Sequence, residues 1–131
     1  MRIVVSLPRR LDRDLLGAVG ISANEYLTLL SLSDAPGRQL RMSDLAGATA
    51  LSASRMTRLV DELQSLGLVT KQASAEDGRG HAAALTPAGR AKLETARGVH
   101  VSSVRALAFD HLDPASRDDA ARALANIANR L

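Results

Sequence analysis

The sequence predicts a mainly α-helical winged helix-turn-helix, with about six helices and a β-wing of two or three strands. Alanine (23) and leucine (21), both strong helix formers, make up about a third of the 131 residues. Two capped apolar segments, 44–48 and 52–66, are separated by a tight turn, and two short extended runs follow them around a glycine-rich turn. The chain has the length of one domain, 1–131.

Two helices are predicted ahead of the helix-turn-helix. Leucines recur at helical spacing over 7–19 and Gly20 follows them, so we expect a short amphipathic helix there. Ser22 and Glu25 have the spacing of a capping box, and the apolar residues after them predict a second helix that ends near 34–37.

The helix-turn-helix follows an extended stretch at 39–42. Ser43 is expected to cap its first helix, 44–48, and Ser52 to cap the longer second helix. Gly67 is placed to end that second helix in the left-handed conformation. The buried stripe of the second helix should consist of Met56, Leu59, Val60, Leu63 and Leu66.

A β-hairpin is predicted next, with strands at 68–70 and 82–85 around a turn-forming run at 73–80. Such a hairpin directly after a helix-turn-helix forms a wing.

Two further helices are expected to complete the chain, one from Thr86-Pro87 to about 109 and one from Asp113-Pro114 onward. The last helix has one apolar face, formed by Ala120, Leu124, Ile127 and Leu131. The helices at both ends carry too few large residues to form a second core, so we expect them to pack across a two-fold axis. The predicted division is 22–87 for the winged helix-turn-helix, with 1–20 and 88–131 as dimerisation helices.

The composition excludes several classes of function. The chain has no cysteine, which excludes disulfides, thiolate metal sites and thiol-based sensing. Its only aromatic residues are Tyr26 and Phe109, so the core should be aliphatic. The apolar run at 3–5 is too short for a signal peptide or a membrane span, and we expect a cytoplasmic protein without a membrane partner.

Nothing in the sequence indicates an enzyme, a metal site or a cofactor. His100 and His111 are 11 residues apart, about 16 Å along a continuous helix, too far to share a metal. His81 lies in the predicted wing, and the glycines around 79 lack the longer loop and lysine of a phosphate cradle.

The positive charge of the chain is concentrated in the helix-turn-helix. The formal net charge is +3, and the segment 38–58 alone carries four arginines against one acid, Asp44. Such a distribution favours a polyanionic partner.

The second helix of the helix-turn-helix has the residues expected of a recognition helix. Ser54, Arg55 and Arg58 are placed to reach base edges in a major groove, and Arg55 is the candidate for a bidentate contact to guanine. Ser52 and Thr57 are candidates for phosphate contacts. The alternative is an ordinary solvated helix face, which the adjacent short helix and hairpin disfavour.

At the wing tip, Arg79 lies between two glycines and is predicted to enter a minor groove. Asp77 is expected to support the wing by pairing with an arginine. Without the preceding helix, these residues would indicate only a surface turn. Arg41 and Lys71 complete the predicted DNA-binding set.

From about Leu7 to the end, the chain resembles the MarR-type (multiple antibiotic resistance regulator) transcription factors. The resemblance is carried by Ile21-Ser22-Ala23-Asn24-Glu25-Tyr26, Leu45-Ala46, Thr57-Arg58-Leu59-Val60-Asp61 with Leu63, Gly67-Leu68-Val69, Asp77-x-Arg79 and Leu85-Thr86-Pro87-Ala88-Gly89-Arg90.

This resemblance implies a homodimer that binds pseudo-palindromic double-stranded DNA, commonly as a repressor, and is often released by a small, frequently aromatic effector. The sequence differs from the family at Lys71, Gln72 and Gly78, where arginine is frequent, so weaker phosphate contacts from the wing are expected. A rival interpretation is a winged helix that binds another protein and has lost DNA binding.

Overall fold

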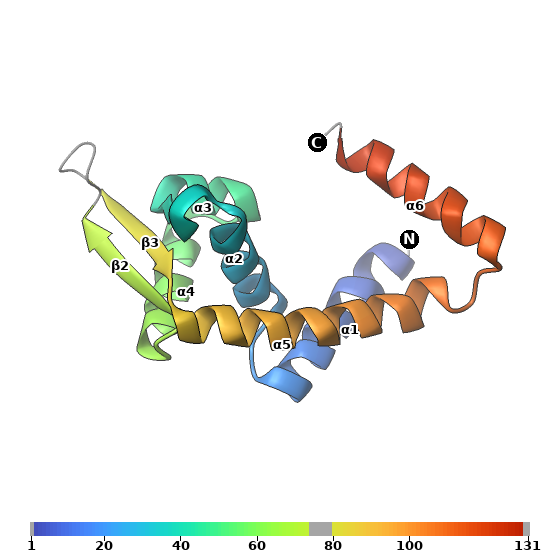
Figure 1. Cartoon of the computed structure of the whole chain (residues 1–131), viewed down its shortest axis with the longest axis horizontal. Coiled ribbons are helices and arrows are strands. Elements are labelled where there is room, and N and C mark those ends of the chain that lie inside the picture. Colours follow the sequence, from blue (N-terminus) through green and yellow to red (C-terminus); the bar gives the residue numbers. More distant parts are fainter. Residues whose placement is uncertain (1, 74–79, 130–131) are drawn as a thin grey trace.

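The structure, a computed structural model, describes residues 2–73 and 80–129 (Figure 1). Its helices and strands are α1 (Arg2–Val19), α2 (Ala23–Asp34), the 3₁₀ turn η1 (Pro36–Arg38), β1 (Gln39–Arg41), α3 (Met42–Thr49), α4 (Ala53–Ser65), β2 (Val69–Ala73), β3 (His81–Leu85), α5 (Pro87–Val104), the π-helical segment η2 (Arg105–Phe109) and α6 (Pro114–Ala128). This arrangement confirms the predicted mainly α winged helix-turn-helix.

The three strands form one antiparallel sheet with the order β1-β3-β2. The hairpin of β2 and β3 is paired from Val69 with Leu85 to Ala73 with His81, so both strands are longer than the sequence predicted. The extended stretch after η1 is the third strand, in which Gln39 pairs with Ala84. The sheet thus joins the wing to the segment that precedes the helix-turn-helix.

The core is aliphatic, as the composition predicts, and lies where α2, α3, α4 and the sheet meet α5. Its fully buried large side chains come from every one of these elements and from α1: Leu15, Ile21, Leu29, Leu32, Leu45, Met56, Val60, Leu63, Val69 and Leu93. Tyr26 is the one aromatic residue among the buried side chains.

The first helix is longer than predicted. It begins at Arg2 rather than Leu7 and contains Pro8. A proline in a helix removes one backbone hydrogen bond, and the turns on either side of Pro8 remain helical despite that loss.

Two details of the helix-turn-helix also differ from the prediction. Ser43 does not cap α3, because this helix already begins at Met42 and its N-cap residue, Arg41, makes no side-chain capping bond. Leu66 is 57% exposed because it lies just beyond the last turn of α4. Gly67 follows with a φ of 72°, as expected for a left-handed residue at a helix end.

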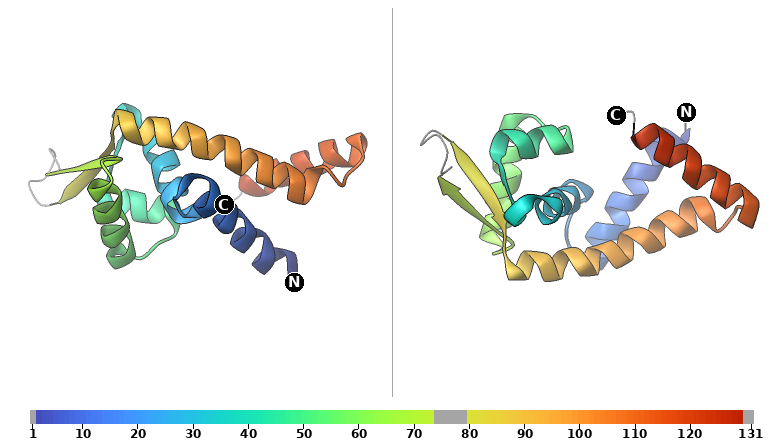
Figure 2. Two further views of the ribbon diagram at one scale, coloured as in Figure 1. Left: turned by 90° about the horizontal axis from the view of Figure 1, so that it is seen from below. Right: turned by 45° about the horizontal axis from the view of Figure 1, so that its top comes forward.

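Polar contacts tie the N-terminal helix to the described chain that follows it. The Asp12 carboxylate accepts a hydrogen bond from the backbone N–H of Ala23 at 2.8 Å. The Lys92 ammonium donates to the Val19 carbonyl at 2.8 Å, which holds α5 against the end of α1. Figure 2 shows α5 running from the sheet past α1.

The last helix packs against no other described element extensively. It turns back after η2 on the side of α5 where the N-terminus also lies (Figures 1 and 2). In the described chain, no single helix is long and apolar enough to cross a membrane. The helical stretches at 6–19 and 23–34 have the combined length and composition to cross a membrane as a pair. These two stretches are bent by 80° relative to each other.

Candidate nucleic-acid interface

The second helix of the helix-turn-helix, α4, is anchored at its start and along one face. The Ser52 hydroxyl accepts a hydrogen bond from the backbone N–H of Arg55 at 3.4 Å, so the predicted N-cap is present. The turn before it contains Ala50 in the left-handed region with a φ of 54°. The inner face of α4 is buried through Met56, Leu59, Val60 and Leu63, which leaves the opposite face in solvent.

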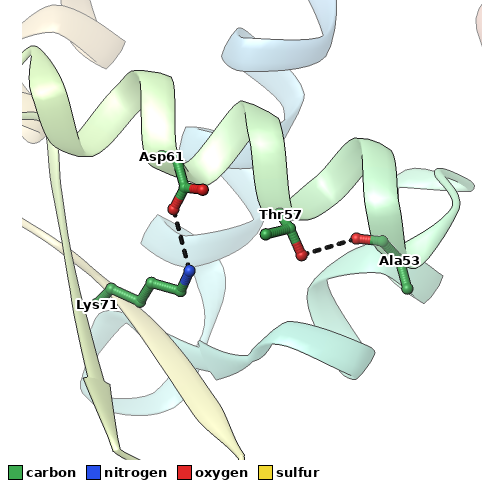
Figure 3. A network of polar contacts seen from close by, with 4 residues as sticks. All are labelled: Ala53, Thr57, Asp61 and Lys71. Carbon is green, nitrogen blue, oxygen red and sulfur yellow. Dashed lines mark hydrogen bonds and ion pairs between the residues drawn. The ribbon is translucent and has the colours of Figure 1, made fainter.

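The five residues predicted on the recognition helix are brought together by this geometry. Ser52, Ser54, Arg55, Thr57 and Arg58 are all exposed over the cap and first two turns of α4. The Thr57 hydroxyl donates to the Ala53 carbonyl at 2.9 Å, which directs its hydrogen back to the helix and leaves its oxygen free to accept (Figure 3).

Neither Arg55 nor Arg58 has a carboxylate partner within the described residues. Together they line a cleft of about 370 Å³ between α4 and the start of α2. Glu62 also lines this cleft, and so does Glu25, whose carboxylate accepts from the Ser22 backbone N–H at 2.6 Å. The cleft therefore has mixed charge, with its cationic side contributed by the recognition helix.

Lys71 is paired with an acidic residue and does not present a free positive charge to solvent. Its ammonium is 3.0 Å from the Asp61 carboxylate, and its side chain is 22% exposed while that of Asp61 is 54% exposed (Figure 3). The sequence analysis did not identify Asp61 as a partner. The pair depends on how β2 lies against α4, and no motif within the nine intervening residues signals that arrangement.

The remaining predicted residues lie outside α4, in β1 or beyond the described residues. Arg41 is half-buried at the end of β1, where it is in register with Ala82 of β3. Arg79 and Asp77 lie outside the described residues.

Two other titratable residues, His100 and Tyr26, form an aromatic stack between α5 and α2. His100 on α5 stacks on Tyr26 of α2, with ring centroids 4.9 Å apart and planes inclined by 27°. Burial lowers the pKa of His100 and raises that of Tyr26. No group of three or more potential metal ligands occurs within 2–73 and 80–129.

A second cavity, of about 520 Å³, was not anticipated from the sequence. Its walls come from η1, the end of β3 and the first turns of α5: Arg38, Leu85, Thr86, Pro87, Arg90, Ala91 and Glu94. The sequence separation between Arg38 and Arg90 explains why the sequence pattern does not reveal this cavity.

Comparison with known proteins places this architecture in context. The model of the MarR family matches residues 19–80. The HTH-type transcriptional repressor YetL of Bacillus subtilis is 30% identical over 94 residues, which are 72% of this chain and 56% of that repressor, so the chain spans little more than half of its length.

Two solved structures from Streptomyces coelicolor are also similar. Sco3205, a MarR family transcriptional regulator crystallised in complex with DNA, superposes with a TM-score of 0.85 and 31% identity, over 99% of this chain and 81% of the other. AbsC, a MarR family transcriptional regulator, superposes with a TM-score of 0.82 and 33% identity, over 98% and 86%.

Proposed function

The chain belongs to the MarR family of transcriptional regulators, and we propose that it binds a pseudo-palindromic DNA operator as a homodimer and represses transcription. One observation carries the proposal. Two exposed guanidinium groups, those of Arg55 and Arg58, lie on the first two turns of a capped helix and have no carboxylate partner within the described chain. This function requires no catalytic step, metal or cofactor.

Major-groove readout would come from the first turns of α4. A helix that enters the major groove presents its N-terminal side chains to base edges, and its free backbone amides attract phosphate. We assign Arg55 to a guanine, Ser54 and Arg58 to neighbouring base edges, and Ser52 and Thr57 to phosphate. The Sco3205 crystals show that a relative of the same fold binds DNA, which supports this assignment.

The wing would add a minor-groove contact through Arg79, with Asp77 supporting it. The paired strands β2 and β3 reach Ala73 and His81, so the described part of the hairpin forms a rigid base for that contact. Narrow minor grooves carry enhanced negative potential, and an arginine there senses groove shape more than sequence. Arg41, at the base of the wing in β1, is proposed as a phosphate contact.

The dimer would form through the end helices, in the proposed division of 1–20 and 88–131 for dimerisation and 22–87 for DNA binding. Large apolar side chains are exposed on these helices, among them Leu16, Val101, Leu107, Leu124 and Ile127. Burying these groups against a second copy of the chain would remove their apolar surface from water and stabilise the dimer. Two recognition helices related by a two-fold axis would then meet half-sites roughly 34 Å apart.

A small-molecule effector completes the proposal. The cavity of about 520 Å³ has a volume in the range of ligand pockets and combines apolar walls with the guanidinium groups of Arg38 and Arg90. The Glu94 carboxylate also lines the cavity, but it lies 3.9 Å from the Arg97 guanidinium, so Arg38 and Arg90 favour an aromatic or aliphatic carboxylate as the ligand. Calorimetric titration with benzoate as the probe should detect binding to the wild-type protein and loss of binding in Arg90→Gln; equal binding by both would exclude this cavity as the effector site.

Selection of bound sequences from random duplexes tests the partner, its symmetry and the half-site spacing together. With the selected operator, an Arg55→Ala, Arg79→Ala double variant should lose the mobility shift, because losing one base contact alone costs roughly 1 to 3 kcal/mol. Arg97→Ala on α5 removes one positive charge away from α4 and is the matched control for each of the two single variants.

The competing function is a winged helix that binds another protein. It predicts no enrichment of any duplex and affinity for DNA that changes little with salt. Operator binding should instead fall steeply between low and physiological salt, because neutralised phosphates release their counterions.

A further inference from the structure

Asp61 is an acid in an unfavourable place for a DNA-binding helix. It is the first acidic residue of α4 and lies four residues after Thr57, so the two side chains are neighbours on the same exposed face. The Asp61 side chain is 54% exposed. An uncompensated carboxylate there would repel the phosphates that the proposed contacts of α4 require.

Lys71 compensates this charge from a different element. It extends from β2, whose backbone at this point is paired with Ala83 of β3, and its ammonium lies 3.0 Å from the Asp61 carboxylate. Only 22% of the Lys71 side chain is exposed, so most of its stem is packed, and its ammonium is engaged by Asp61 in the wild-type protein. The pair bridges the recognition helix and the base of the wing (Figure 3).

We infer that Asp61 and Lys71 form a positioning pair that sets the discrimination between operator and non-operator DNA, with Lys71 neutralising Asp61 instead of contacting a phosphate. The inference rests on the proposed DNA binding and replaces the phosphate-contact role that the sequence suggested for Lys71. The pair holds α4 and the wing at one relative angle. It also keeps the Lys71 ammonium and the Asp61 carboxylate from interacting with the phosphates of the DNA.

The two partners have opposite consequences when removed. Without Lys71, the exposed Asp61 carboxylate repels nearby phosphates, so operator affinity falls. Without the Asp61 charge, the Lys71 ammonium becomes available to any phosphate. Affinity for DNA of every sequence then rises, while the ratio of operator to non-operator affinity falls.

A double-mutant cycle separates the positioning pair from a direct phosphate contact. Wild type, Lys71→Met, Asp61→Asn and the double variant are titrated with the selected operator and with a non-operator duplex over a series of salt concentrations. Lys71→Met should weaken operator binding in the wild-type background without lowering the salt slope. In the Asp61→Asn background it should remove the additional phosphate contact and return the slope to the wild-type value, since coupled residues are non-additive.

The salt dependence provides a second readout that a merely structural role would not change. Asp61→Asn should steepen the slope of log affinity against log salt by about 0.9, the value for one additional phosphate contact. Between 50 and 200 mM salt, one such contact changes affinity by about threefold. Lys71→Arg preserves the pair and should retain wild-type discrimination.

Glu62→Gln is the matched control, because it removes the same charge from the next residue of α4 and Glu62 has no lysine partner among the described side chains. Lys71→Met and Glu62→Gln should be additive. If Lys71→Met lowers the salt slope by about 0.9 equally with and without Asp61→Asn, Lys71 is a phosphate contact and the inference is overturned. If the wild-type protein binds no duplex at all, the proposed function fails instead.

Discussion

The carbonyl oxygen of Leu68 fills the space that a side chain on residue 89 would need: a Cβ built on Gly89 would lie 2.0 Å from that oxygen. The same carbonyl accepts a hydrogen bond from the Thr86 backbone N–H at 3.1 Å, and the Thr86 hydroxyl donates to the Gly67 carbonyl at 2.7 Å. The first turn of α5 is thereby held against the start of β2. The orientation of the long helix relative to the wing depends on this contact.

Gly89→Ala should therefore destabilise the fold. A Cβ at 2.0 Å from a backbone oxygen forces the backbone to move, and overpacking of this kind costs about 1 to 3 kcal/mol, more than the gain of up to about 1 kcal/mol from replacing a helical glycine. The free energy of unfolding measured in urea should fall accordingly.

The control for this prediction is Gly98→Ala in the same helix. No heavy atom lies within 4 Å of a Cβ built there, so the substitution should stabilise the protein by up to about 1 kcal/mol. If both variants gain stability, the close approach of α5 to β2 is not maintained in solution.

Helix starts were well predicted where a local motif determines them. Ser22 with Glu25, Thr86 with Pro87 and Asp113 with Pro114 all form the expected caps, because each side chain bonds to backbone within three residues. Local signals failed where packing or strand pairing decides. Ser43 has the chemistry of a cap, yet α3 begins one residue before it, directly from β1.

Contacts between distant elements account for the features of the interface that sequence could not reveal. The recognition-helix residues could be predicted because a cap and a buried stripe fix which face of α4 is exposed. The partnership of Lys71 with Asp61 depends on the path of β2 beside that helix, and the close approach of Gly89 to Leu68 depends on the angle of α5. Neither leaves a periodic pattern in the sequence.

The two serines near the helix-turn-helix provide a test of capping. Ser52→Ala removes the hydroxyl that accepts from the Arg55 N–H, and the loss of such a cap costs about 1 kcal/mol. Ser43→Ala should change stability by much less, because Ser43 lies within α3 and caps nothing. Thermal unfolding of both variants without DNA measures the difference, and equal losses would contradict the assigned cap.

The stacked pair of His100 and Tyr26 predicts a dependence of stability on pH. Burial lowers the pKa of His100 below its ordinary 6.5, so at pH values just below 6.5 the unfolded chain binds a proton that the folded chain does not. Stability is then complete above 6.5 and decreases as the pH falls toward the lower pKa of the folded state. The unfolding midpoint should decline between pH 7.5 and 5.5 in the wild type.

His100→Gln should flatten this decline, whatever its effect on stability at pH 7.5. Asp14 and Asp113 do not interfere, because hydrogen bonds from Ser103 and Ser116 hold the pKa of each carboxyl below 3.8, outside this range. A slope that persists unchanged in the variant would assign the titration to another group.

Removing apolar side chains from α6 should weaken the dimer. Leu124 and Ile127 are each 56% exposed in the single chain, and burying such a side chain against a partner contributes roughly 1.5 to 3 kcal/mol. A Leu124→Lys, Ile127→Lys double variant should therefore shift the mass measured by light scattering from dimer toward monomer at micromolar concentration. Leu66→Lys is the control, because Leu66 is exposed to nearly the same extent, 57%, but lies at the end of α4 and not on α6. A wild-type protein that is already monomeric would exclude the two-fold arrangement, and dissociation caused by Leu66→Lys alone would move the interface to the DNA-binding part.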